Sequence, residues 1–141
     1  MPNIVQNGDG STGFRGTDGD EGGFVPVNIE YNASSIDKVS FVATRAYIVK
    51  AITWRPTIAG TDGGAVTGVI KKAASATAIT AGTALHSGTA NLKGTADTIQ
   101  ALTLSTTQSD LLIPAGTAIG VDFTGTLTSA TGVVTVMLAP A

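Results

Sequence analysis

Apolar residues recur at every second position along parts of this chain. Ile119, Val121 and Phe123 alternate with small or polar residues over 118–124. This period of two is typical of a β-strand with one face on a core. The segment 133–138 is apolar at nearly every position, which predicts a central strand or a strand covered by a partner.

Runs rich in Val, Ile and Thr, separated by Gly, Asp and Ser, predict several more strands. We assign them to 39–44, 46–57, 66–72, 98–104 and the segments on either side of Pro114-Ala115-Gly116. The Gly-rich turn 60–64 predicts a hairpin that joins 46–57 to 66–72. Between 73 and 94 the chain is rich in Ala, Thr and Gly, and we expect one short turn of helix there at most.

Strands spaced about ten residues apart, with turns between them, predict an all-β fold. The expected architecture is an antiparallel β-sandwich, jelly-roll-like, or a barrel. No segment of normal helix length has a helical period.

The first 23 residues differ from the rest. They contain seven glycines with acidic residues among them, and they hold too little apolar surface to form a core. Residues 24–31 fit either a strand or an extended connector. We therefore predict an extended Gly-rich N-terminal arm over 1–35 and a β-sandwich body over 36–141. The residues of the arm expected to bind a partner are Ile4, Val5, Phe14, Arg15, Phe24, Val25 and Tyr31.

Low charge and few aromatic residues indicate association with other proteins. Charged residues make up 13% of the chain, aromatic residues 5%, and the net charge is −2. Such a chain lacks the basic patches that nucleic acid requires, and no apolar run is long enough to span a membrane. Its mean hydropathy of +0.29 suggests that a partner covers part of its surface. We expect a homotrimer, with Trp54, Val133 and Met137 as possible interface residues.

The residues that usually carry chemistry are scarce. There is no Cys, and His86 is the one histidine, so zinc sites and Ser-His-Asp catalysis lack their components. The acidic segment 18–21 lacks the ligand spacing of an EF-hand. We expect His86 to be a loop residue, and we expect no catalytic residue, no metal site, no cofactor and no enzymatic activity.

Residues 47–140, about two-thirds of the chain, resemble head decoration (cement) proteins of tailed bacteriophages. The resemblance rests on several segments read together, namely 52–56 with its Trp and Arg, the turn 60–64, the segment 69–72, the Gly-Thr pairs 82–83, 88–89 and 94–95, the segment 111–117, and the strand 133–140.

The resemblance implies a structural virion protein. Decoration proteins sit on the outer capsid surface of the expanded head, often as trimers, and bridge neighbouring major capsid subunits. The implied partners are the major capsid protein and other copies of the chain, and the protein would be made in the host cytoplasm. Two alternatives stay open: another virion component, such as a head fibre or tail protein, and a carbohydrate-binding β-sandwich module. The second would need exposed aromatic side chains, for which Trp54, Tyr47 and Tyr31 are a small supply.

Overall fold

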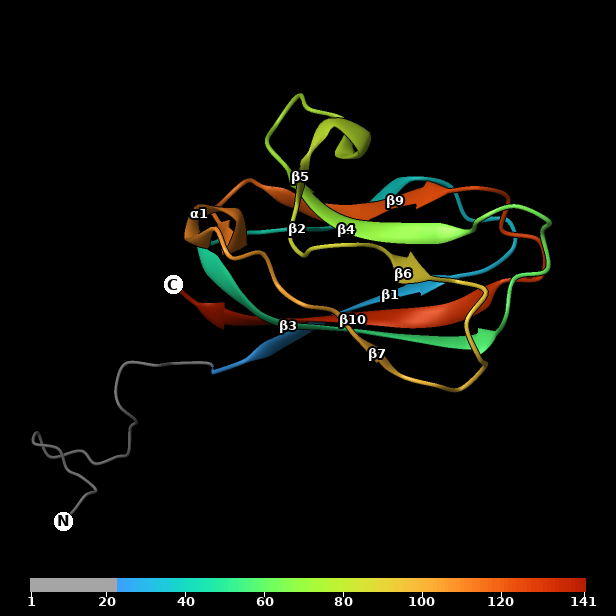
Figure 1. Ribbon diagram of the computed structural model, residues 1–141. Helices are drawn as coiled ribbons and strands as arrows, with labels where there is room; N and C mark the ends of the chain where they lie inside the picture. The colour runs from blue at the N-terminus through green and yellow to red at the C-terminus, as the bar shows by residue number, and fades with distance from the viewer. Residues whose placement is uncertain (1–22) are drawn as a thin grey trace, which may run out of the picture.

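The computed structural model describes residues 23–141 and shows a nearly all-β fold (Figure 1). Of these residues, 49% lie in strands and 6% in helices. The helical elements are the 3₁₀ turn η1 (Ile79–Ala81) and the single turn α1 (Gln108–Leu111). The all-β antiparallel fold predicted from the sequence is therefore confirmed, and η1 is within the limit of one short helical turn expected over 73–94.

Sheet A has five antiparallel strands and forms the lower layer in Figure 1. Its central strand is the one predicted from the apolar run at 133–138. The order is β1 (Val25–Tyr31), β10 (Thr131–Pro140), β3 (Tyr47–Ile58), and then β7 (Gln100–Ala101) and β8 (Leu112–Ile113), which both pair with β3.

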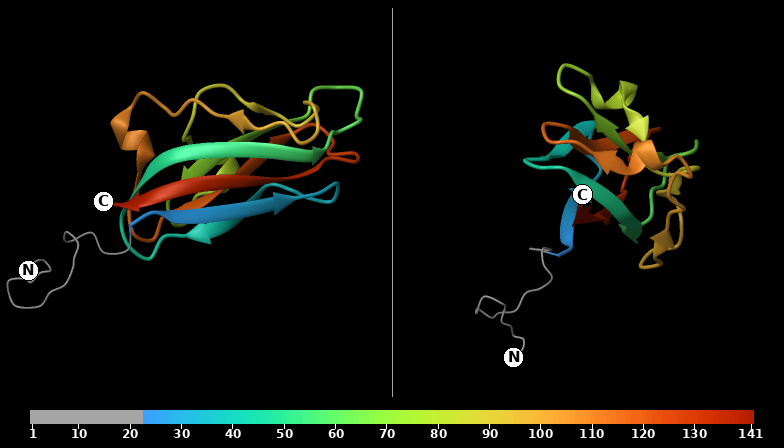
Figure 2. Two further views of the ribbon diagram at one scale, coloured as in Figure 1. Left: turned by 90° about the horizontal axis from the view of Figure 1, so that it is seen from below. Right: turned by 90° about the vertical axis from the view of Figure 1, so that its left-hand side faces the viewer.

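Sheet B, also five-stranded and antiparallel, forms the upper layer. Its order is β2 (Lys38–Val42), β9 (Ala118–Thr124), β4 (Thr67–Ala73), and then β5 (Thr83–Ala84) and β6 (Ala90–Asn91), which both pair with β4. Figure 2 shows the two layers from below and from one end.

The core lies between the two sheets and is built by alternation along each strand. In β10, Val134, Val136 and Leu138 are fully buried, whereas Val133 and Met137 on the other face are half-buried. In β9, Ile119 and Val121 enter the core, as the alternation over 118–124 predicts.

The sandwich is closed on one side and open on the other. On the closed side, the chain passes from one sheet to the other: β5 and β6 pair with β4 of sheet B, and β7 then pairs with β3 of sheet A. Backbone bonds from Leu85 N–H to the Ile70 carbonyl and from Leu102 N–H to the Ile52 carbonyl, 2.9 and 3.0 Å long, tie it to both sheets. On the open side, β1 and β2 are the edge strands. A bond from Lys38 Nζ to the Glu30 carbonyl oxygen, 3.2 Å long, links them.

Two predictions from the sequence need correction. The boundary at residue 35 is wrong, because Val25–Tyr31 pairs with β10 along its whole length as strand β1. The hairpin of 46–57 with 66–72 is also wrong, because β3 and β4 lie in different sheets. The turn 60–64 crosses from one layer to the other, so these strands pack across the core instead of side by side.

Candidate interaction surfaces

The structure distributes the predicted binding residues among the core, the edge of sheet A and its outer face. Ile4, Val5, Phe14 and Arg15 lie outside the described residues. Phe24 is exposed, Val25 is half-buried in β1, and Tyr31 is buried in the core. Trp54 was expected at an interface, but its side chain is completely buried. Val133 and Met137 lie partly exposed on the outer face of sheet A, where a partner can reach them.

Trp54 is buried because it connects the two sheets. It extends from β3 toward β4, where Gly68 leaves room for the indole ring, since a Cβ at Gly68 would collide with it. Its Nε1 donates a hydrogen bond to the Tyr31 hydroxyl at 3.0 Å, and the two ring centroids lie 5.5 Å apart. Burial raises the pKa of Tyr31, and the bond from Trp54 partly opposes the rise. With Tyr47 buried as well, none of the three aromatics considered for a carbohydrate-binding platform is exposed.

His86 is a structural residue of sheet B. It lies outside the named strands, as predicted, yet it is 4% exposed. Nε2 accepts a hydrogen bond from the Ile70 N–H at 3.0 Å, and Nδ1 lies 3.1 Å from the Ser87 carbonyl oxygen. Nδ1 therefore carries the proton, and the ring fills a gap between β5 and β6 along β4. Burial lowers the pKa of His86, and the bond to Ser87 partly opposes this.

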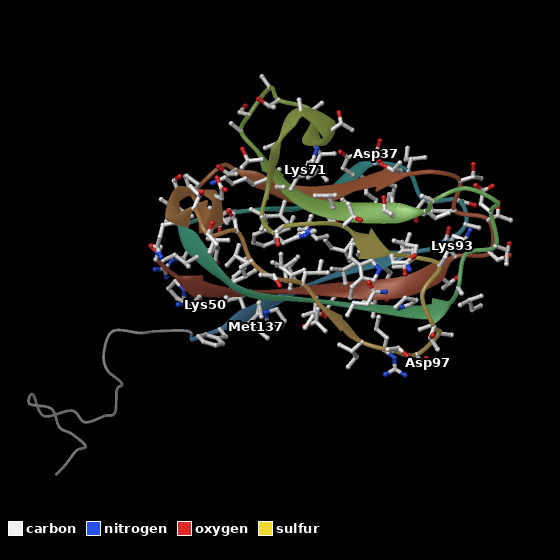
Figure 3. The ribbon with its side chains drawn as sticks, viewed as in Figure 1. Asp37, Lys50, Lys71, Lys93, Asp97 and Met137 are labelled. Atoms are coloured by element: carbon white, nitrogen blue, oxygen red, sulfur yellow. The ribbon has the colours of Figure 1, made fainter. Side chains whose placement is uncertain are left out.

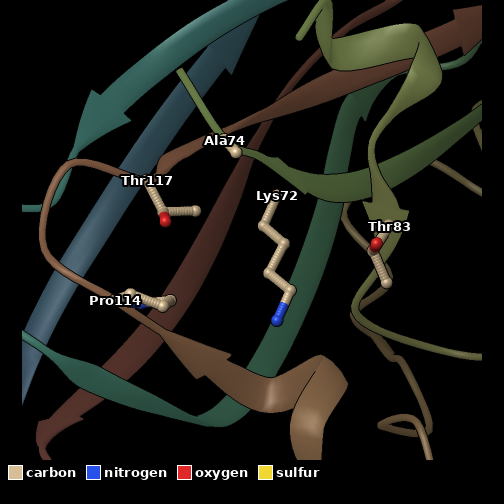
Figure 4. A pocket seen from close by; sticks show the side chains of 5 residues that line it. All are labelled: Lys72, Ala74, Thr83, Pro114 and Thr117. Carbon is tan, nitrogen blue, oxygen red and sulfur yellow. The ribbon is translucent and has the colours of Figure 1, made fainter. Parts of the chain in front are cut away.

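Lys72 borders a small cleft of about 230 Å³ that is open to solvent (Figure 4). The other lining residues are Ala74, Thr83, Pro114 and Thr117. Its ammonium group is already engaged, because Nζ donates to the carbonyl oxygens of Ser109 and Leu112 at 2.6 and 2.7 Å. Burial lowers the pKa of Lys72, and the nearby Asp110 carboxylate partly opposes this. The lysine thus satisfies the carbonyl groups around α1 and leaves the cleft without a free charge.

The outer face of sheet B carries a small cover formed by residues 74–82, which we call the lobe. It stands above β4 and β9 at the top of Figure 1. Ile79 is buried against Gly120, where a Cβ would contact both the Ile79 side chain and the Lys38 carbonyl. Lys71 Nζ bonds the Asp122 carboxylate at 2.6 Å and the Thr80 carbonyl at 2.7 Å. Lys71 thus joins β4 to β9 through the ion pair and holds the lobe on the sheet through its bond to Thr80.

The outer face of sheet A has no such cover among the described residues. Three rows of side chains cross it, and each row contains one residue from β1, one from β10 and one from β3. They are Pro26, Met137 and Ala51; Asn28, Thr135 and Thr53; and Glu30, Val133 and Arg55. A bond of 2.7 Å from the Thr135 hydroxyl to Asn28 Oδ1 confirms that the middle row shares one face. Figure 3 shows Met137 on the side of sheet A that faces away from sheet B.

Exposed apolar residues also gather at β2, on the open side. Ile36 is 74% exposed, Val42 55% and Val39 49%. Val39 and Val42 belong to the edge strand, and Ile36 lies just before it. A β-bulge between Val39 and Phe41 interrupts the ladder with β9, a device that discourages indiscriminate edge pairing. We call Ile36, Val39 and Val42 the β2 patch.

Within residues 23–141, no three His, Cys, Asp or Glu side chains come together as metal ligands would. The acidic segment 18–21 lies outside this range. A second open cleft, of about 300 Å³, lies at one end of sheet A, where Glu30 is its one charged lining residue. Neither cleft gathers the groups that catalysis needs.

Comparisons with known protein families, with curated proteins and with solved structures found no match. Among the described residues, no helix is both long enough and apolar enough to cross a membrane.

Proposed function

We propose that this chain is a structural virion protein that binds the outside of a phage head and stabilises it by bridging major capsid subunits. The resemblance over residues 47–140 supports this proposal, and so does the distribution of polar groups in the fold. The observation that carries it is that the buried or half-buried charged and histidine side chains are engaged within the fold, while two apolar surfaces with few charges remain outside.

The engaged groups include those best suited to chemistry. His86 bonds two backbone groups, Lys72 bonds two carbonyls, and Lys71 bonds Asp122 and a carbonyl. Because these side chains are occupied by bonds within the fold, we expect the protein to act by binding other molecules through its surface. Exposed apolar surface rimmed by polar residues is typical of protein–protein contacts.

Bridging requires at least two separate contacts. The β2 patch, on the open side of the sandwich, offers one such contact, and the apolar residues that precede β1 offer a second. We assign capsid contact to the β2 patch and to Ile4, Val5, Phe14 and Arg15, which precede β1 in the chain. Several weak contacts of this kind add up when a capsid presents many copies of its subunit.

The test is co-sedimentation of the purified chain with expanded heads assembled from the major capsid protein of the same genome. The full chain is expected to sediment with the heads and raise their melting temperature. Deletion of residues 1–23 is expected to leave the melting temperature of the chain unchanged, because β1 starts at Val25, and to remove most of the binding.

Two matched variants test the β2 patch. Val39→Lys with Val42→Lys should weaken binding, since two charges would have to be desolvated at the contact. Ile58→Lys with Ile99→Lys makes the same change at two exposed residues elsewhere, 54% and 60% exposed, and should bind as the unaltered chain does. If the full chain does not sediment with the heads, the proposed function is wrong.

A further inference from the structure

The outer face of sheet A combines apolar residues with an asymmetric pair of charges. Val133 and Met137 form a stripe along β10, flanked by uncharged residues in the first two rows. In the third row, Glu30 on β1 and Arg55 on β3 stand on opposite sides of Val133. Each is separated from β10 by one strand spacing, about 4.8 Å.

This arrangement is self-complementary under a twofold rotation. A twofold axis lying between two copies and parallel to β10 places β1 of one copy opposite β3 of the other. Residues of one row stay opposite the same row. Glu30 of each copy then faces Arg55 of its partner, and Val133 faces Val133.

We propose that the outer face of sheet A binds a second copy of this chain across a twofold axis parallel to β10, with Glu30 of each copy paired to Arg55 of the other. Sheets that pack face to face lie about 10 Å apart. A glutamate and an arginine side chain together span that distance. Arg55 also bonds Asp97, with Nη2 to Oδ1 at 3.0 Å, and the guanidinium keeps further N–H donors for a second carboxylate.

The size of the face fits a reversible dimer. The 10 residues of β10 span about 33 Å, and four neighbouring strands span roughly 19 Å. The area covered is thus on the order of 600 Å² per copy, at the lower end of specific interfaces. Besides Asp97, which is paired with Arg55, the remaining charge near this face is Lys50. It is exposed beside the bulge in β3 and would face the Pro26 end of the partner's β1, which has no like charge in the rows described.

A second copy fits better than an unrelated partner because the complementary charges belong to the same surface. A surface that matches itself under rotation is the requirement for a closed twofold interface. Such a pair differs from the homotrimer predicted from the sequence. It does not depend on capsid binding, and it can be measured without capsids.

The test is sedimentation equilibrium of the full chain over micromolar concentrations, with charge variants. Glu30→Arg and Arg55→Glu should each weaken the dimer by about tenfold or more, because like charges would then face each other twice. The double variant Glu30→Arg with Arg55→Glu should recover most of the affinity. Arg45→Glu makes the same charge change in the loop between β2 and β3 and should leave the dimer unchanged. Circular dichroism checks that each variant folds.

Three outcomes would overturn the proposal. They are a monomer at every concentration, a trimer, and a dimer that Thr135→Arg at the centre of the face does not disrupt. Failure of the charge swap to restore a dimer weakened by both single variants would also contradict the predicted pairing.

Discussion

The outer faces of the two sheets differ in how far other described parts of the chain cover them. Sheet B is covered in part by the lobe, with Ile79 packed on Gly120 and the pair Lys71–Asp122 beneath it. Sheet A has the longer strands, and within residues 23–141 no lobe covers its outer face, which is mainly uncharged apart from Glu30 and Arg55. On sheet B, the partly buried Lys71 holds the lobe in place. The outer face of sheet A remains available for another molecule to cover.

The difference between the two outer faces depends first on the contact that Trp54 makes between the sheets. Trp54→Ala would empty the space against Gly68 and leave the Tyr31 hydroxyl without its donor. We expect a loss of about 3–5 kcal/mol in the free energy of unfolding, measured by denaturant titration. The neighbouring Arg55→Ala, on the exposed face, should cost at most about 1 kcal/mol. A small effect at Trp54 would mean that the sheets are held together elsewhere.

Adding one or two carbon atoms to a side chain should distinguish the covered outer face of sheet B from the outer face of sheet A. Gly120→Ala would force the lobe or β2 to move, because the new Cβ meets Ile79 and the Lys38 carbonyl. A loss of about 1–3 kcal/mol is expected from such overpacking. On sheet A, Ala51→Val adds bulk to an exposed strand position and should change stability by less than about 0.5 kcal/mol. Equal effects in thermal unfolding would remove the distinction between the faces.

The attachment of the lobe should depend on Lys71, which bonds both Asp122 on β9 and the Thr80 carbonyl of the lobe. Lys71→Met keeps the aliphatic chain but leaves Asp122 and the Thr80 carbonyl without their donor. The side chains of the pair are only 17% and 23% exposed, so we expect a loss of roughly 1–2 kcal/mol, with faster hydrogen exchange over 74–82. Arg55→Met breaks the exposed pair with Asp97 on sheet A, which should cost less than about 1 kcal/mol. Unchanged exchange in the lobe would contradict this account.

The smallest expected effect is a pH dependence specific to sheet B. The pKa of His86 is lowered in the folded chain, so as pH falls through about 6.5 the unfolded chain takes up the proton first. Stability from the neutral ring is therefore present above pH of about 6.5 and declines below it. Melting temperatures between neutral and mildly acidic pH, above the range where carboxylates titrate, should show this fall. His86→Gln, whose amide oxygen can still accept from Ile70, should show less of it. An equal fall in both proteins would assign the effect to other groups.

Local patterns in the sequence predicted the features that depend on neighbouring residues. The alternation of Ile119 and Val121 marked β9 correctly, and the apolar run at 133–138 marked the central strand of sheet A. The strand β1 also alternates, with Val27, Ile29 and Tyr31 buried. Its boundary was misplaced because a Gly-rich segment precedes it and its partner, β10, lies more than 100 residues away in the chain.

Features that depend on distant residues could not be predicted. A Gly-rich turn such as 60–64 can reverse the chain within one sheet or carry it to the opposite sheet, and local composition is the same in both cases. The burial of Trp54 depends on Gly68 across the core. The row Glu30–Val133–Arg55 depends on the register of three strands that are far apart in sequence. The sequence shows that Val133 and Met137 are apolar, but it does not show that Glu30 and Arg55 lie on either side of Val133.

The position of β10 has a consequence for synthesis of the protein. It lies between β1 and β3 yet is the last of the strands to leave the ribosome. Until it emerges, the edges of β1 and β3 that will flank it have no partner, and the nascent chain carries two exposed strand edges that are prone to pairing with other chains. Sheet A therefore forms only at the end of translation of the body. A chain terminated before residue 131 would lack β10. We expect the cell's proteases to degrade such a chain, because it cannot form a smaller version of the same fold.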